Sequence, residues 1–76
     1  MIKVVLHDYL INEHKHLKPE SDIPHFSGMS VGDIIKGLDI QYDILGLIVL
    51  DGLSVTSEAK VGDNSKVEFY PSFTLG

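Results

Sequence analysis

Cysteine is absent from this 76-residue sequence, and that absence excludes several classes of protein. A chain without cysteine has no disulfide framework, no redox-active CxxC pair and no thiolate zinc site. Packing alone must therefore stabilise it, and a hydrophobic content of 43% is too high for a disordered chain. At this length we expect one domain, spanning residues 1–76.

Long apolar runs are missing as well. The first apolar stretch is interrupted at His7 and Asp8, far short of the ~20 apolar residues of a membrane helix or the ~7–15 of a signal-peptide core. We therefore expect no membrane partner, and the cytoplasm is the expected location.

Positive charge is scarce: the sequence has six basic and eleven acidic side chains, which gives a net charge of −5. Nucleic acids are held mainly by clustered lysine and arginine, so we expect no nucleic-acid partner. Residues 33–68 carry seven acids and three lysines, a net charge of −4. Two interpretations stay open: an acidic surface that keeps a small protein monomeric when free, or a docking face for a basic partner.

Motifs for catalysis are also lacking. The sequence has no GxSxG nucleophile motif and no phosphate-binding P-loop, and a domain of this size has little room for a closed pocket of about 300 Å³. We therefore expect no enzymatic activity and no bound cofactor.

Four histidines raise the question of a metal site. His14 and His16 would face the same side of an extended segment, with Glu13 beside them. A zinc site needs three or four ligands, and His7 and His25 have no defined spacing to this pair. We predict no metal site and interpret the pair as solvated loop residues, although metal binding by His14 and His16 stays open.

The hydrophobic period predicts strands on both sides of one helix. We expect strands at residues 2–6, 21–26, 46–50, 53–56 and 66–70. The second should lie at an edge or be short, because Pro19 and Pro24 cannot donate to a sheet. The continuous apolar run at 46–50 is typical of a central strand covered on both faces. Asp51 and Gly52 predict a type I′ turn, which needs positive φ at both residues.

The helix should begin after Ser30. The spacing of Val31, Ile34, Ile35 and Leu38 gives one apolar face, and Asp33 lies where a capping box requires an acidic or amide side chain. The element order predicts an α+β domain, with the helix on one face of a mixed sheet and the first and last strands as central neighbours.

The last strand is followed by the sequence PSFTLG. Pro71 should end this strand, so we expect a flexible C-terminal tail over residues 71–76. The tail is either a frayed end or a segment that presents a carboxylate to an enzyme.

Three sequence motifs resemble those of a known protein family. They are VGDIIKGL at 31–38, GLIVLDG at 46–52 and VGDNSKVEFYP at 61–71. Together they resemble the ThiS/MoaD group of ubiquitin-like β-grasp proteins over residues 29–73. The resemblance implies a β-grasp fold with a mixed four- to five-stranded sheet and one main helix on one face.

The same resemblance implies a sulfur carrier. In that family an E1-like enzyme adenylates the terminal glycine carboxylate, which here would be that of Gly76, and converts it to a thiocarboxylate. A sulfur-accepting synthase then uses the sulfur to make molybdopterin or thiamine, or the sulfur is used to thiolate tRNA. The family ends in Gly-Gly, whereas this sequence has Leu75 before Gly76. The alternative is a β-grasp interaction module that has lost the diglycine and is not conjugated.

For a partner-binding surface we predict Tyr70 and Phe73, together with Leu75 of the tail and Leu53 of the last hairpin. The competing interpretation of Tyr70 and Phe73 is that they cover the edge of the core. Val67, Phe69, Ile48, Leu50, Val4 and the apolar helix face are predicted to form the core itself.

Overall fold

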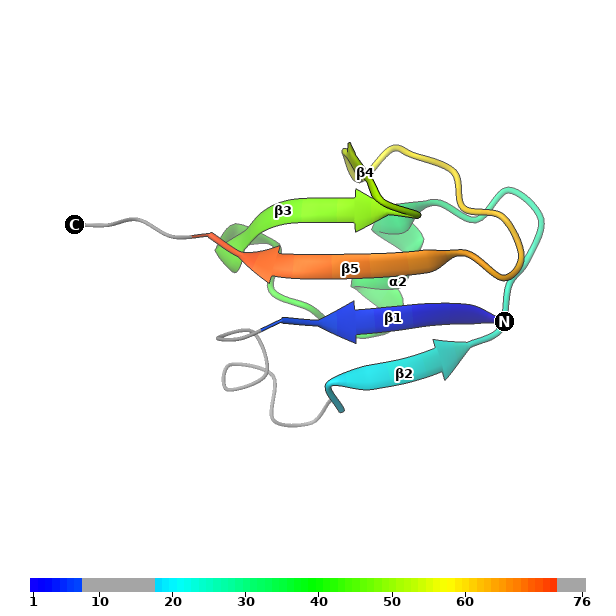
Figure 1. Cartoon of the computed structure of the whole chain (residues 1–76), viewed down its shortest axis with the longest axis horizontal. Coiled ribbons are helices and arrows are strands. Elements are labelled where there is room, and N and C mark those ends of the chain that lie inside the picture. The colour runs from blue at the N-terminus through cyan, green and yellow to red at the C-terminus, as the bar shows by residue number, and fades with distance from the viewer. Residues whose placement is uncertain (8–17, 73–76) are drawn as a thin grey trace.

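In the part of the chain that the structure describes, a five-stranded mixed sheet carries one α-helix across one face (Figure 1). The computed structural model describes residues 1–7 and 18–72. In chain order the elements are β1 (Ile2–Leu6), β2 (Glu20–Ile23), α2 (Val31–Gly37), the 3-10 helix η1 (Tyr42–Ile44), β3 (Leu45–Leu50), β4 (Leu53–Val55) and β5 (Lys66–Pro71). The strand order is β2-β1-β5-β3-β4.

The centre of the sheet is the parallel pair of β1 and β5, as the sequence predicts. Val4 pairs with Val67, and Leu6 pairs with Phe69, and all four side chains are buried. β3 joins the other side of β5 in antiparallel fashion. Because β1 and β5 run in the same direction, both end at the same edge of the sheet (Figure 1).

The strand predicted at 21–26 forms an edge strand as expected, but its bounds were wrong. β2 covers Glu20–Ile23 and stops before Pro24. Proline cannot donate to the ladder, which explains why pairing ends there. At the other end, the carbonyl of Pro19 accepts a hydrogen bond from the N–H of Leu6, at 2.8 Å.

The helix begins where the sequence predicts. The Ser30 hydroxyl accepts the N–H of Asp33 at 3.2 Å, and the Asp33 carboxylate accepts the N–H of Ser30 at 2.9 Å. These reciprocal bonds satisfy donors that the first turn leaves without helical partners. Val31, Ile34 and Ile35 turn toward the sheet and are buried. η1 was not predicted, because three residues carry no recognisable period.

The hairpin of β3 and β4 confirms the predicted turn, since φ is 50° at Asp51 and 87° at Gly52. The prediction that the strand at 46–50 is covered on both faces was wrong. Ile48 is buried beneath the helix, but Leu47 is 43% exposed on the opposite face. Among the described residues, no second helix covers that face, which we call the open face: it carries Val5, His7, Glu68, Tyr70, Leu47 and Val49.

The core lies between the sheet and α2, and its largest fully buried side chain is Phe69. The predicted core positions are buried, except that Leu38 and Leu50 are only half-buried at its margin. No helix in the described part of the chain is both long enough and apolar enough to cross a bilayer.

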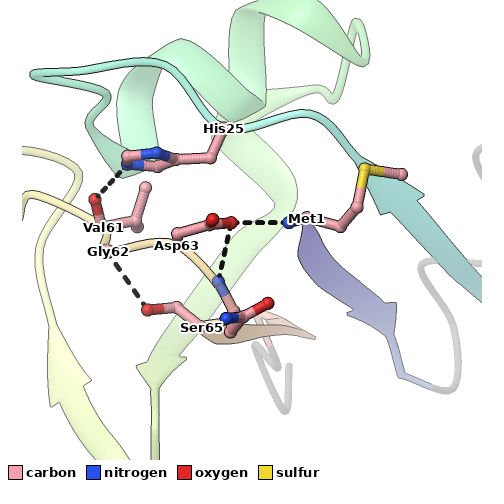
Figure 2. A network of polar contacts seen from close by, with 7 residues as sticks. Met1, His25, Val61, Gly62, Asp63 and Ser65 are labelled. Carbon is pink, nitrogen blue, oxygen red and sulfur yellow. Dashed lines mark hydrogen bonds and ion pairs between the residues drawn. The ribbon is translucent and has the colours of Figure 1, made fainter.

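Polar contacts connect the start of β1 to the loop before β5 (Figure 2). The Asp63 carboxylate accepts from the Met1 amine at 2.5 Å and from the Asn64 N–H at 3.0 Å. Nearby, the Ser65 hydroxyl accepts the N–H of Gly62, and a ring nitrogen of His25 lies 3.0 Å from the carbonyl of Val61. These contacts lie at one end of the sheet, and β1 and β5 finish at the other end (Figure 1).

Candidate functional site

The edge at which β1 and β5 end is the candidate site, because the chain leaves the sheet there toward its C-terminus. The prediction that Pro71 ends the strand before it was wrong: β5 runs through Pro71, which pairs with Leu45 of β3. β1 ends at Leu6, opposite Phe69, so Pro71 has a described strand on one side only. A proline is tolerated in such an edge-like position.

Gly46 makes this pairing possible. A Cβ atom placed on Gly46 would lie 2.6 Å from the carbonyl oxygen of Pro71 and 2.8 Å from the Cα of Ser72. The ladder between β3 and β5 also shifts register between Leu45 and Leu47. A glycine at a β-bulge therefore lets the last residues of β5 approach the start of β3 closely.

Three polar or aromatic side chains meet on the open face beside this exit. His7 follows β1 directly, while Glu68 and Tyr70 lie two residues apart on β5 and so share a face. The His7 Nε2 is 2.9 Å from the Glu68 Oε2, and the Tyr70 hydroxyl donates to the same oxygen at 3.4 Å. The His7 and Tyr70 rings are stacked, with centroids 4.2 Å apart and planes 2° from parallel. We call these residues the His7–Glu68–Tyr70 cluster.

The cluster is electrostatically coupled. The hydrogen bond from His7 lowers the pKa of the Glu68 carboxyl, and partial burial opposes that effect. The charges of Lys66 and His7 and the hydrogen bond from Tyr70 lower the Glu68 pKa further. Side-chain exposure is 30% for His7 and 18% for Glu68, so water still reaches the cluster.

The structure separates two of the residues predicted to share a binding surface. Tyr70 lies on the open face next to Leu47, its partner across β3. Leu53 pairs with Leu50, whose side chain packs against the core, so Leu53 belongs to the helix side of the sheet, where it is 72% exposed. Leu53 also lies at the opposite end of β3 from Leu47.

The other predicted tail residues, Phe73, Leu75 and Gly76, lie outside the described residues, as do His14 and His16. Within the described ranges 1–7 and 18–72, no three His, Asp or Glu side chains are grouped as metal ligands would be. His7 is the site residue that the sequence analysis missed. Strand alternation could have indicated it. His7 is two residues beyond Val5 and so shares its face, and the neighbouring strand carries Glu68 and Tyr70 on that face.

Four of the seven acids of residues 33–68 bind local donors at separate places. Asp33 caps α2, the Asp51 carboxylate accepts the N–H of Lys66 at 2.9 Å, and Asp63 binds the Met1 amine. Glu68 alone of these four lies on the open face. These four carboxylates are therefore engaged in local contacts, and the acidic docking face stays an expectation.

Among the hollows lined by described residues, two lie beside α2. One of about 270 Å³ is mainly apolar and lies between α2 and the segment after β2, with Phe26 and Met29 in its lining. The other, of about 470 Å³, runs beside α2 past Ile35, Ile40 and Tyr42. Both are open to solvent, and neither contains a member of the His7–Glu68–Tyr70 cluster.

Solved structures share this fold. The crystal structure of SAMP1 from Haloferax volcanii is 13% identical, with a TM-score of 0.76 over 99% of this chain and 98% of that one. A second structure, of H. volcanii small archaeal modifier protein 1, gives 0.74 at 13% identity over 95% and 97% of the two chains. A protein described as molybdopterin converting factor, subunit 1, from Pyrococcus furiosus gives 0.75 at 16% identity over 95% and 97%.

Neither a protein-family model nor a curated protein matches the sequence. The structural agreement therefore establishes the fold: this chain has the ubiquitin-like β-grasp fold of these small proteins, across nearly its whole length and theirs.

Proposed function

We propose that this chain is a ThiS/MoaD-like sulfur carrier that acts in the cytoplasm as a protein substrate rather than as a catalyst. The observation that carries the proposal is the full-length match to a molybdopterin converting factor subunit and to a small archaeal modifier. The three sequence motifs that resemble the ThiS/MoaD group are an independent support. They fall on α2, on β3 with its turn, and on β5 with the loop before it.

The proposed chemistry takes place at the carboxylate of Gly76. In an E1-like partner, a carboxylate oxygen attacks the α-phosphorus of ATP and pyrophosphate leaves, which gives an acyl-adenylate. A sulfide-level nucleophile supplied by the partner then attacks the acyl carbon, and AMP leaves as the thiocarboxylate forms. A sulfur-accepting synthase for molybdopterin or thiamine, or a tRNA-thiolation enzyme, is the proposed acceptor.

The body of the domain suits this role because it holds the tail's origin in place. β5 is the middle strand of the sheet, and the chain passes from its last residue, Pro71, directly into the segment that ends at Gly76. Holding one end of a reacting segment on a rigid scaffold reduces the entropy lost when a partner binds it. Leu75 is the departure from the family pattern, since it places a branched side chain next to the reacting glycine.

Intact-mass spectrometry tests the proposal directly. The protein is incubated with ATP and its cognate E1-like enzyme, and then with a sulfur donor. We expect a mass increase equal to one adenylyl group, and then one equal to the replacement of an oxygen by a sulfur. The matched control lacks Gly76 and should stay unmodified.

A Leu75→Gly variant completes this experiment. If the natural sequence stays unmodified while Leu75→Gly reacts, the tail is the obstacle and the carrier proposal fails for this protein. If neither reacts, the proposal also fails, for a reason outside position 75.

The open face favours one other function, that of an interaction module that is not conjugated. Leu47 is 43% exposed there beside Tyr70, an apolar surface that a partner could cover. For such a module, removal of Gly76 should leave partner binding unchanged, whereas Leu47→Asp should weaken it. Loss of binding on removal of Gly76 would contradict this second function.

A further inference from the structure

We infer that the outer edge of β2 and the apolar hollow beside it form a peptide-binding site, which takes an extended segment of alternating apolar and basic residues. The segment would pair with β2 as an additional strand of the sheet. This inference goes beyond the proposed function and does not depend on it, because β1 separates β2 from β5, the strand that leads to the tail.

The backbone of β2 is the first argument. β2 lies at one edge of the sheet, and no described strand pairs with its outer side (Figure 1). The Pro19 carbonyl accepts the N–H of Leu6 and therefore points toward β1. Backbone groups alternate in direction along a strand, so the N–H and C=O groups of Glu20 and Asp22 point outward. An edge with unpaired donors and acceptors is a template for a further strand.

The hollow beside this edge is the second argument. It has a volume of about 270 Å³, and Ile23, the last residue of β2, is part of its lining. Phe26 lies in the same lining and is 53% exposed. Among the described residues that line the hollow, the only charged one is Asp33, which is bonded to Ser30. Every second side chain of an added strand would lie beside Ile23 on the helix face, so the hollow favours apolar residues at those positions.

The charge on the other face of β2 is the third argument. Glu20 and Asp22 alternate with Ile23, so they lie on the open face, where both are exposed. Within the described residues, the Asp22 carboxylate has no hydrogen-bonding partner. The nearby cations are Lys18, exposed before the strand begins, and Lys3, 3.7 Å from Glu20. Lys3 belongs to β1, so it leaves the outer side of both carboxylates open to basic residues of an added strand.

The same two carboxylates argue against a second copy of this chain as the occupant. If two β2 edges paired with each other, Glu20 and Asp22 of one copy would lie opposite the same acids of the other. Like charges directly opposite each other destabilise a strand pair, and charged residues on edge strands commonly prevent such pairing. A strand with lysine or arginine at these positions converts the repulsion into attraction. The edge therefore selects its partner by the sign of its charge.

The first experiment titrates the full-length protein with a peptide of about seven residues in which lysine alternates with valine, blocked at both ends. NMR follows the amide signals of the protein. We expect a Kd of roughly 30–300 μM at low salt, weakened by added salt, with the largest shifts at the N–H groups of Glu20 and Asp22.

Two control peptides separate pattern from composition. One has the same lysines and valines in two blocks, and the other has glutamate in place of lysine. Each should bind at least about tenfold more weakly than the alternating lysine peptide. Equal binding of the alternating and the block peptide would overturn the inference.

N-methylation of the peptide tests strand pairing while the protein stays unchanged. One peptide is methylated on the amides of its lysines, and another on the amides of its valines. The lysine amides face β2 in an antiparallel pair, and the valine amides face it in a parallel pair. One of the two peptides should therefore lose binding and the other should keep it. Binding kept by both, or lost by both, would contradict pairing with the edge.

A charge exchange in the protein tests selection by sign. The double variant Glu20→Lys, Asp22→Lys should lose the lysine peptide and gain the glutamate peptide, each by about tenfold. If this variant does not fold, Glu20→Gln with Asp22→Asn should weaken the lysine peptide roughly threefold or more and remove most of its salt dependence. An unchanged preference in a folded variant is evidence against the site.

Phe26→Ser tests the hollow. Because Phe26 is 53% exposed, its replacement should leave the fold intact, and we expect a roughly three- to tenfold weaker alternating peptide. Tyr42→Ser is the matched control: Tyr42 is 58% exposed and lines the other hollow beside α2, so peptide binding should not change. Equal losses in the two variants would show that the hollow is not part of the site.

Two measurements on the free protein test the other possible occupants of the edge. We expect a monomer in analytical ultracentrifugation and rapid hydrogen exchange at the N–H groups of Glu20 and Asp22. A dimer that the double lysine variant dissociates would assign the edge to a second copy of the chain. Protected amides in a monomer would show that another part of the chain covers the edge. Either result would overturn the inference.

Discussion

Individual carboxylates accept several of the hydrogen bonds that hold turns and the helix start in this protein. Asp33 is the best example, since the Ser30 backbone N–H and hydroxyl both donate to it and lower its pKa. The same pair gives α2 a defined start, which matters because a helix of seven residues has too few internal hydrogen bonds to form alone.

Replacing Ser30 by alanine tests the cap. The substitution removes the hydroxyl that accepts the Asp33 N–H, and we expect it to lower the free energy of unfolding by about 1 kcal/mol. Urea denaturation measures the change. Ser54→Ala, at an exposed position on the edge strand β4, is the control and should stay within about 0.5 kcal/mol of the natural protein. Equal losses in both variants would show that the cap contributes nothing.

Among the elements, the junction of β3 and β5 determines where the tail begins. The glycine of the bulge and the proline that ends β5 fit each other, because only a residue without Cβ lets the Pro71 carbonyl come so close. The core side of the same strands is held by Ile48 and Phe69, which are paired in register. Core packing therefore holds β3 and β5 in register, and Gly46 allows the close approach of Pro71 where the chain leaves the sheet.

Two glycine-to-alanine substitutions should have opposite signs. Gly46→Ala should destabilise the protein by roughly 1–3 kcal/mol, because its Cβ would overlap the backbone of Pro71 and Ser72. Gly37→Ala, in the last turn of α2, meets nothing within 4 Å and should stabilise it by roughly 0.5–1 kcal/mol. Thermal and urea unfolding of both variants give the comparison. A neutral Gly46→Ala would contradict the close approach.

Across the whole molecule, acidic groups that bind donors make stability depend on pH. The pKa values of Asp33, Asp63 and Glu68 are all lowered in the folded protein: Ser30, the Met1 amine and His7, respectively, are the main causes. A lowered pKa means that the unfolded chain binds protons first as the pH falls. The stabilisation is therefore complete above the ordinary values of 3.8 and 4.5 and is lost below them.

We accordingly expect the urea midpoint to hold steady between pH 7 and 5.5 with respect to these carboxyls, and to fall below about pH 4.5. Glu68→Gln should make the acid decline shallower, since glutamine does not titrate. Glu58→Gln, at an exposed position in the turn after β4, serves as the control and should retain the full decline. A midpoint that stays constant down to pH 3 would contradict the lowered pKa values.

Local rules in the sequence determined most of the architecture. Alternation and the 3.6-residue period placed the strands and the helix, Ser30 and Asp33 marked the helix start, and Asp51 with Gly52 set the hairpin. The motif resemblance also predicted the β-grasp fold that the structural comparisons confirm. These features could be predicted because each depends on residues close together in the chain.

Only the tertiary structure decided what surrounds the tail's origin. His7 and Glu68 are 61 residues apart, and the parallel register of β1 and β5 is what brings them within 2.9 Å. The same register, with that of the β3–β4 hairpin, puts Tyr70 and Leu53 on opposite faces. Alternation fixes which face of each strand is buried, but a shift of two residues keeps the faces and changes the neighbours, so local pattern alone does not decide which residues meet across distant segments. The sequence by itself therefore determined the elements, the fold and the candidate carrier end, whereas tertiary pairing decided which side chains stand beside it.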